Sequence, residues 1–195
     1  AMTASQTTHN ISMPAGTVNT GDLLVMFFGN DGTVQPTTPS GWSVITQSSQ
    51  SVFYGTVYAK ISDGSEGGGT VNVSTSTNAR GVGQVYRITR WYGNLTNGVG
   101  GTSTQGVSSA GPTNYPDPPS QTASVADRHL WLAGVAHDNA TASTGPTNYT
   151  NLTQNSAVVM ITTARRVLYA LTENPSTFDM SYPTNWIAST VYIRP

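Results

Sequence analysis

Apolar residues in this chain recur at every second position or in short unbroken runs, and turn residues separate the runs. The run from Leu23 to Gly29 follows the turn-forming stretch 19–22 and is typical of a fully buried strand. In Thr70 to Ser76, Val71 and Val73 alternate with polar residues, which is typical of a strand with one buried face. The pattern predicts an all-β domain with strands near 23–29, 42–46, 51–61, 70–76, 81–91, 130–136, 157–171, 177–182 and 186–193.

Two stretches of the chain look like copies of one another. Asp22 to Gln47 aligns without a gap on His129 to Gln154, and a shorter match relates Val57-Tyr58-Ala59 to Leu168-Tyr169-Ala170. Both long stretches have the order strand block, Asp-containing loop, proline, aromatic residue and Thr-Gln. The identical positions are Leu23, Asp31, Thr37, Pro39, Thr46 and Gln47 in the first copy and Leu130, Asp138, Thr144, Pro146, Thr153 and Gln154 in the second.

A repeat of this length is too long for a solenoid unit and indicates a duplicated half-sandwich. We predict a single β-sandwich or jelly-roll-like domain over residues 1–195, built from half-repeats at about 9–94 and 119–195. The halves are expected to pack as a pseudo-twofold pair around one core, because neither alone covers both faces of its sheet. Asp31 and Asp138 are then equivalent turn residues, with carboxylates that accept bonds from amides two residues on.

The stretch from Gly93 to Ser120 is rich in Gly, Ser, Thr and Asn and has no clear strand pattern. Such a run inside a compact domain is either a functional loop or a connector between units. Because the segments on either side look like copies, a connector at about 93–120 is the favoured interpretation.

Charged residues make up only 9% of the chain, the net charge is -1, and Lys60 is the only lysine. This composition offers no basic surface for a nucleic-acid backbone, and no apolar run is long enough to span a membrane. We therefore expect neither a nucleic-acid partner nor membrane insertion. The chain has no cysteine, which excludes a disulfide framework and a thiolate zinc site.

A catalytic site needs a nucleophile beside a base, or two carboxylates in contrasting environments. Most acidic residues here lie beside Gly, Asn or Pro, where a turn role is typical. His137 and Asp138 are neighbours, but adjacent strand residues point to opposite faces. We expect no enzyme activity, no cofactor and no metal; calcium held by loop oxygens is a minor hypothesis, and a deep pocket with converging acids or His137 would favour catalysis.

Aromatic residues suggest a different chemistry. The four tryptophans fall within strand patterns and are predicted to lie in the core, whereas Tyr92, Tyr115 and Tyr149 flank loops. These three tyrosines are the predicted ligand-binding residues, because exposed rings can stack on sugars. Four arginines in or beside strands are interpreted as edge charges that oppose aggregation: Arg87, Arg90, Arg165 and Arg166.

Several short motifs resemble a family of uncharacterised bacteriophage and metagenomic virion-associated proteins. They span nearly the whole chain and consist of strand and turn residues, so they are specific for a fold rather than for an activity. The motifs are Met13-Pro14-Ala15-Gly16, Gly21-Asp22-Leu23-Leu24-Val25, Thr38-Pro39-Ser40-Gly41-Trp42, Tyr58-Ala59-Lys60, Val85-Tyr86-Arg87-Ile88 and the closing Ala188-Ser189-Thr190-Val191-Tyr192-Ile193-Arg194-Pro195.

The resemblance implies a non-catalytic structural or accessory protein of a phage particle: a capsid decoration, a head fibre or a tail or host-adhesion domain. It implies a location on the virion surface or outside the cell, with other virion proteins or a host cell-surface glycan as partners. By the same analogy we expect a homo-oligomer such as a trimer. The alternative is a carbohydrate-binding module of a secreted protein, which the loop tyrosines would serve.

Overall fold

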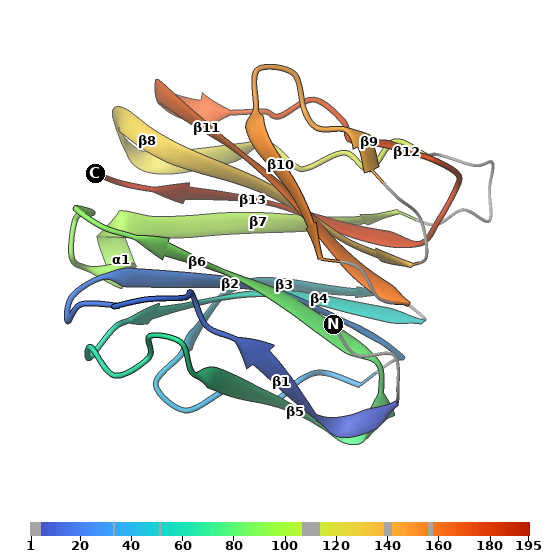
Figure 1. Ribbon diagram of the computed structural model, residues 1–195. Helices are drawn as coiled ribbons and strands as arrows, with labels where there is room; N and C mark the ends of the chain where they lie inside the picture. Colours follow the sequence, from blue (N-terminus) through green and yellow to red (C-terminus); the bar gives the residue numbers. More distant parts are fainter. Residues whose placement is uncertain (1–4, 33, 51, 107–113, 139–141, 156–157) are drawn as a thin grey trace.

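The computed structural model describes residues 5–32, 34–50, 52–106, 114–138, 142–155 and 158–195 (Figure 1). Strands make up 62% of these described residues, and the one helix in these ranges is the single turn α1 (Leu95–Gly98). The prediction of an all-β sandwich is confirmed. The strands are β1 (Gln6–Ser12), β2 (Leu23–Asp31), β3 (Ser43–Gln50), β4 (Phe53–Ile61), β5 (Thr70–Ala79), β6 (Gly81–Ile88), β7 (Val99–Gly106), β8 (Gln121–Asp138), β9 (Ala142–Thr144), β10 (Thr150–Asn155), β11 (Val159–Glu173), β12 (Asp179–Met180) and β13 (Trp186–Ile193).

Two large antiparallel sheets lie face to face (Figure 1). The first sheet has the strand order β3-β4-β2-β6 and comes entirely from the first half of the chain. The second sheet has the order β10-β11-β8-β13-β7. Each half of the chain therefore forms a sheet of its own, and the main core lies between the two.

The two sheets repeat one strand plan. Strands β3, β4, β2 and β6 occupy the places that β10, β11, β8 and β13 occupy in the second sheet. The offset of the sequence alignment also holds in the hydrogen-bonded ladders: Ser43 pairs with Ala59, and its aligned counterpart Thr150 pairs with Arg165. Beyond these pairs both ladders shift register before the aligned Thr-Gln dipeptide.

The turn that precedes β3 recurs before β10. The Trp42 N–H donates to the Pro39 carbonyl at 3.1 Å, and the Tyr149 N–H donates to the Pro146 carbonyl at 3.0 Å. The third residue of each turn has a left-handed backbone, with φ of 78° at Gly41 and 66° at Asn148. A type II turn requires positive φ at this position, which explains why Gly and Asn occupy it.

Aligned residues of the two sheets face one another across the core. A Cβ placed on Gly134 would lie 2.4 Å from the ring of Phe27, which is its aligned counterpart. A Cβ placed on Gly29 would lie 2.9 Å from the Cβ of its own counterpart, Ala136. Contacts between equivalent positions are what a local twofold relation between the sheets produces.

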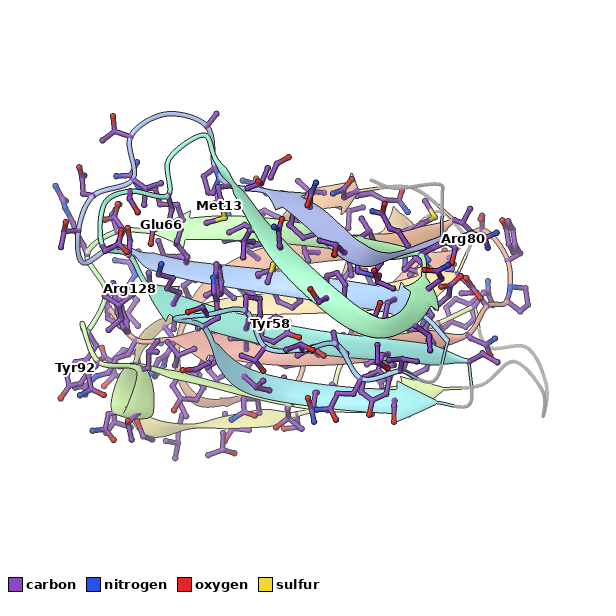
Figure 2. All side chains as sticks on the ribbon, turned by 90° about the horizontal axis from the view of Figure 1, so that it is seen from below. Met13, Tyr58, Glu66, Arg80, Tyr92 and Arg128 are labelled. Atoms are coloured by element: carbon purple, nitrogen blue, oxygen red, sulfur yellow. The ribbon has the colours of Figure 1, made fainter. Side chains whose placement is uncertain are left out.

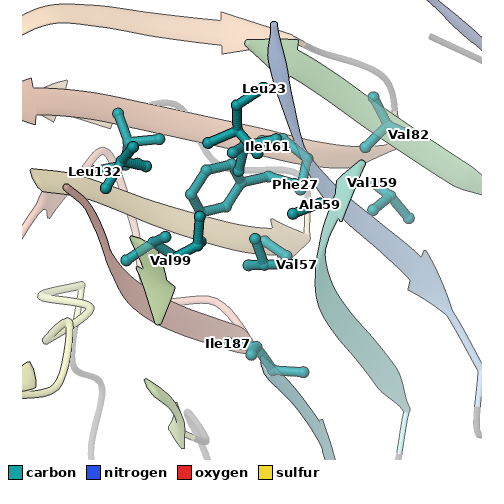
Figure 3. Packing of buried hydrophobic residues seen from close by; sticks show 14 of the residues in the cluster. Leu23, Phe27, Val57, Ala59, Val82, Val99, Leu132, Val159, Ile161 and Ile187 are labelled. Atoms are coloured by element: carbon teal, nitrogen blue, oxygen red, sulfur yellow. The ribbon is translucent and has the colours of Figure 1, made fainter. Parts of the chain in front are cut away.

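The core between the sheets is aliphatic apart from two aromatic rings, Phe27 and Phe53, and Figure 3 shows how side chains from both sheets interdigitate there. Each sheet is also covered on its outer face, the first by the β1–β5 pair and the second by the β9–β12 pair with its flanking loops. Strand β2 is therefore buried on both faces, which accounts for its unbroken apolar run. The main core comprises Leu23, Val25, Phe27, Phe53, Val57, Ala59, Val82, Val99, Leu132, Ala136, Val159, Ile161, Ile187, Val191 and Ile193.

The shorter sequence match is wrong as a structural equivalence. Val25 pairs with Ala59 on β4, but Leu132, the counterpart of Val25, pairs with Arg165 on β11. The tripeptide 168–170 that was matched to Val57-Tyr58-Ala59 therefore lies further along β11, beyond the part that has a partner in the first half. Three similar residues are too few to fix a register, because each apolar strand position accepts several residue types.

The stretch 93–120 is more ordered than its composition indicates. It contains α1 and β7, and β7 pairs along its whole length with β13 as the outer strand of the second sheet. The absence of a strand pattern misled the prediction because β7 has a neighbour on one side only and consists mostly of Gly, Ser and Thr. Residues 107–113 of the predicted connector lie outside the described residues.

The amides two residues on from Asp31 and Asp138 lie outside the described residues, so the predicted turn bonds stay a prediction. The Asp31 carboxylate accepts from the Arg80 backbone N–H at 2.5 Å and pairs with the Arg80 guanidinium at 3.5 Å. The charges of both Asp31 and Arg80 act on the carboxylate of the counterpart residue, Asp138. The aligned acids therefore lie at the same end of the sandwich. Burial, followed by the charge of Asp31, raises the pKa of Asp138, while Arg80 opposes the shift.

Candidate functional site: an arginine-lined pocket

The second sheet is longer than the first at one end of the sandwich. Strands β8 and β11 run for 18 and 15 residues, whereas β2 and β4 run for nine each. In Figure 1 the free end of the β8–β11 strand pair curves away from the first sheet, at the side of the chain's C-terminus. The core-facing side of β11 therefore continues into solvent, and Val167 and Tyr169 are 56% and 71% exposed.

A pocket of about 440 Å³ lies where the first sheet ends and the β8–β11 strand pair continues beyond it. Its apolar lining comes from Ile88 at the end of β6, Leu130 on β8, Val167 on β11 and Ile193 at the end of β13, with Trp91 beside them. Pockets of this size that combine an apolar lining with a few polar groups are typical ligand sites. The charged residues of the lining are four arginines, Arg90, Arg128, Arg165 and Arg194.

Three contacts fix the aromatic residues at the rim. The indole N–H of Trp91 donates to the Gly21 carbonyl at 2.9 Å. The Arg194 guanidinium lies 4.2 Å from the ring centre of Tyr92, in a cation–π contact, and the Tyr92 N–H donates to the Arg194 carbonyl at 3.1 Å. The rim is therefore tied to both β2 and the C-terminal segment.

The four arginines differ in their partners. Arg194 pairs with Asp127 at 3.3 Å, and Arg165 faces the side-chain amide of Asn151, which we orient so that its oxygen accepts from the Arg165 Nε at 3.0 Å. Arg90 and Arg128 have no carboxylate at ion-pair distance among the described residues. The pocket therefore holds an excess of positive charge.

Asp127 is the acid nearest to this group and stays ionised. A hydrogen bond from the Arg128 backbone N–H and the neighbouring Arg194 lower the pKa of Asp127, against a smaller opposing effect of burial. Its charge offsets that of Arg194. It does not offset the charges of Arg90, Arg128 and Arg165.

Arg90 has a strained backbone, with φ of 57°. The left-handed region is unfavourable for a residue with a long side chain by about 1–2 kcal/mol, and such strain tends to persist at functional positions. Arg90 lies two residues after the end of β6 and is exposed at the pocket rim. This conformation is a second, independent feature that marks the pocket.

The three predicted tyrosines do not form one site. Tyr92 lies beside the pocket through its contact with Arg194, and it is labelled near Arg128 in Figure 2. Tyr115 is 51% exposed on the segment whose neighbours Asn114 and Pro116 bond to the β12 region. Tyr149 is half-buried on the outer face of the second sheet, where burial, followed by Glu173, raises the pKa of its phenol.

The histidines have structural surroundings. His137 is fully buried, its Nε2 lies 3.0 Å from the Thr162 hydroxyl, and burial lowers its pKa to about 4. His9 is also fully buried, 3.3 Å from the Thr75 hydroxyl, and burial lowers its pKa. Both rings are therefore uncharged near neutral pH. Within the described ranges no three His, Asp or Glu side chains converge as a metal site, and no helix is long and apolar enough to cross a membrane.

Sequence reasoning missed the pocket because its residues come from four strands, or the segments just after them, that are far apart in the sequence. From the sequence, Arg90 and Arg165 were interpreted as edge charges. No role was predicted for Arg128, and Arg194 was named only as part of the closing motif. The one available signal was compositional: few charged residues are present, so a cluster of arginines in space is unusual. Comparison of the chain with protein-family models, with curated proteins and with solved structures found no match.

Proposed function

We propose that this chain is a non-catalytic protein of a phage particle's surface, a decoration, head-fibre or tail-adhesion domain, which binds its partner through the arginine pocket. The observation that carries the proposal is the pocket itself, an apolar cavity with excess positive charge at the end of a sandwich. Binding sites favour the margins of such rigid frames. The virion setting comes from the sequence resemblance.

Three of the six motifs that carry the resemblance also supply residues in or beside the pocket. Gly21, from the motif before β2, anchors the indole of Trp91. The next residue of that motif, Asp22, pairs with Arg87 of the β6 motif at 2.6 Å. Arg194, from the closing motif, lines the pocket directly. Three of the motifs that resemble virion-associated proteins thus supply residues in or beside the region where we place the binding surface.

The proposal predicts that the protein is part of the particle. Particles produced from the parent phage genome should be labelled by gold-conjugated antibodies against this chain in electron micrographs. A parallel preparation from a genome with this gene deleted is the matched control. Intact particles that carry none of the protein would contradict the virion assignment.

A carbohydrate-binding module of a secreted protein is the second candidate. The observation that favours it is the pair of aromatic rings, Trp91 and Tyr92, at the border of the pocket, since aromatic rings beside a pocket are suited to sugar stacking. A protein that is absent from particles but retains polysaccharides on an affinity gel would support this candidate over the first.

A further inference from the structure

We propose that the arginine pocket binds a carboxylate-bearing sugar, a uronic acid residue of a cell-envelope glycan. The inference rests on the proposed function in taking the pocket as the partner-binding surface. It adds the chemical class of the ligand, which neither the fold nor the resemblance specifies.

The charge of the pocket is the first step. The chain has eight lysine and arginine residues in total, and the pocket lining holds four of them with no acidic side chain. In a chain with a net charge of -1, this concentration selects an anionic ligand. All four are arginines, whose planar guanidinium groups match carboxylates with two parallel hydrogen bonds.

The apolar surface of the pocket is the second step. An inorganic anion would use the guanidinium groups but leave Leu130, Val167 and Ile193 uncovered. A sugar ring presents a face of C–H groups that packs on such surfaces and on the edge of an indole, here that of Trp91. A uronic acid combines this ring face with a carboxylate, and so uses both halves of the lining.

The arrangement on β11 is the third step. Arg165 and Arg166 are adjacent and point to opposite faces of the strand. Arg166 pairs with the buried Glu173 at 2.9 Å, so the Glu173 carboxylate balances its charge. Arg165 faces the pocket, and among the described residues its side chain has an amide partner, Asn151, but no carboxylate at ion-pair distance. Of these two neighbouring arginines, Arg165 is therefore the one whose charge can interact with a ligand.

A compact ring suits this site better than an extended acidic peptide. Peptides that bind to sheets gain affinity by pairing their backbone with a free strand edge. This pocket is instead lined by side chains of the core-facing side of β8 and β11, and these strands pair with each other at Leu130 and Val167. The ligand therefore meets side chains rather than a ladder of backbone groups.

Isothermal titration of the full chain with uronic acid oligomers tests the inference. The panel contains tetramers of galacturonate, glucuronate and mannuronate, with the carboxyl-reduced neutral tetramers as matched sugars. We expect at least one uronate tetramer to bind at least tenfold more tightly than its neutral counterpart, with affinity that falls as salt concentration rises. Inorganic phosphate, galactose 6-phosphate and tetraglutamate serve as alternative sources of negative charge, and each should bind more weakly than that tetramer.

Substitutions locate the site. Arg90→Gln and Arg128→Gln should each weaken uronate binding about tenfold, because each removes a charge-assisted contact. Arg80→Gln removes the same charge at the opposite end of the sandwich and should leave the affinity unchanged (Figure 2). Thermal unfolding of every variant verifies that the fold is retained.

The outcomes separate this inference from the proposed function. Equal binding of neutral and uronate tetramers, no binding by any uronate, or tighter binding of phosphate or tetraglutamate would each overturn the uronate assignment. Binding that survives both pocket substitutions would overturn the location. Gold labelling of particles is unaffected by these results, so a particle-borne protein that ignores uronates keeps the proposed function and loses only the ligand.

Discussion

The two sheets of this protein share one strand plan, but their central strand pairs, β2–β4 and β8–β11, differ in length. In the first sheet the β2–β4 ladder stops at the pair Leu23 and Ile61. In the second sheet the β8–β11 ladder continues past the equivalent position, as far as the pair Gln121 and Glu173. The shared part builds the core, and the unshared part provides one wall of the arginine pocket. The comparison teaches that the repeated plan supplies the frame while the departure from symmetry supplies the candidate site.

Within the part that both sheets share, we expect the largest loss of stability from changes at the contact between Phe27 and its counterpart Gly134. Phe27→Gly should lower the free energy of unfolding by about 3–5 kcal/mol through a cavity. Gly134→Phe should also be strongly destabilising, because a Cβ at this position would already lie 2.4 Å from the Phe27 ring. The double variant exchanges the two residues across the local twofold and should recover at least about 1 kcal/mol relative to the sum of the single changes. Chemical denaturation measures all three.

A control for this exchange combines Phe27→Gly with Val44→Phe, at a position that is 40% exposed and outside the core. Its two effects should add within about 0.5 kcal/mol. Additive effects in the Phe27 and Gly134 pair as well would mean that these residues do not complement each other across the core.

The second comparison concerns Asn30 and His137, which are aligned and both fully buried. Burial lowers the pKa of His137 from 6.5 to about 4, so between these pH values the unfolded chain binds a proton that the folded chain does not. The free energy of unfolding should therefore fall as pH falls through this window, by on the order of 3 kcal/mol. His137→Asn places the first sheet's residue in the second and should flatten this dependence.

Unfolding measured by denaturant at pH 7, 6, 5 and 4 provides the test. A residual slope from His9, whose pKa burial also lowers, should remain in the variant. His9→Asn serves as the parallel variant that retains the larger slope of His137. An unchanged slope in His137→Asn would show that this ring does not control the acid sensitivity.

The smallest expected effect concerns the repeated turn, where Gly41 and Asn148 hold the same left-handed position. Gly41→Ala should lower the free energy of unfolding by about 1–2 kcal/mol, because alanine is unfavourable at positive φ. Asn148→Gly should change stability by less than about 1 kcal/mol, since both residue types tolerate this conformation. Thermal unfolding of the two variants distinguishes them, and equal losses would argue against a shared turn geometry.

The local features of this fold were readable from the chain. The turn at Pro39 and its copy at Pro146, the buried strand from Leu23 and the shared offset of the two long stretches all depend on residues close in sequence. The ordered strand β7 was not predicted, because Gly, Ser and Thr show no period, and its position is set by pairing with β13 far along the chain. The tyrosine prediction identified one residue next to the pocket, Tyr92, but did not identify the pocket.

The sequence by itself determined the β class and the repeated strand–turn–strand units, since these follow from period and turn chemistry. Only the tertiary structure decided that Phe27 lies over Gly134 and that Arg90, Arg128, Arg165 and Arg194 converge on one pocket. The physical reason is that ladder lengths and sheet packing bring strand ends together across long separations in the chain. No local sequence pattern indicates which strands come together in this way.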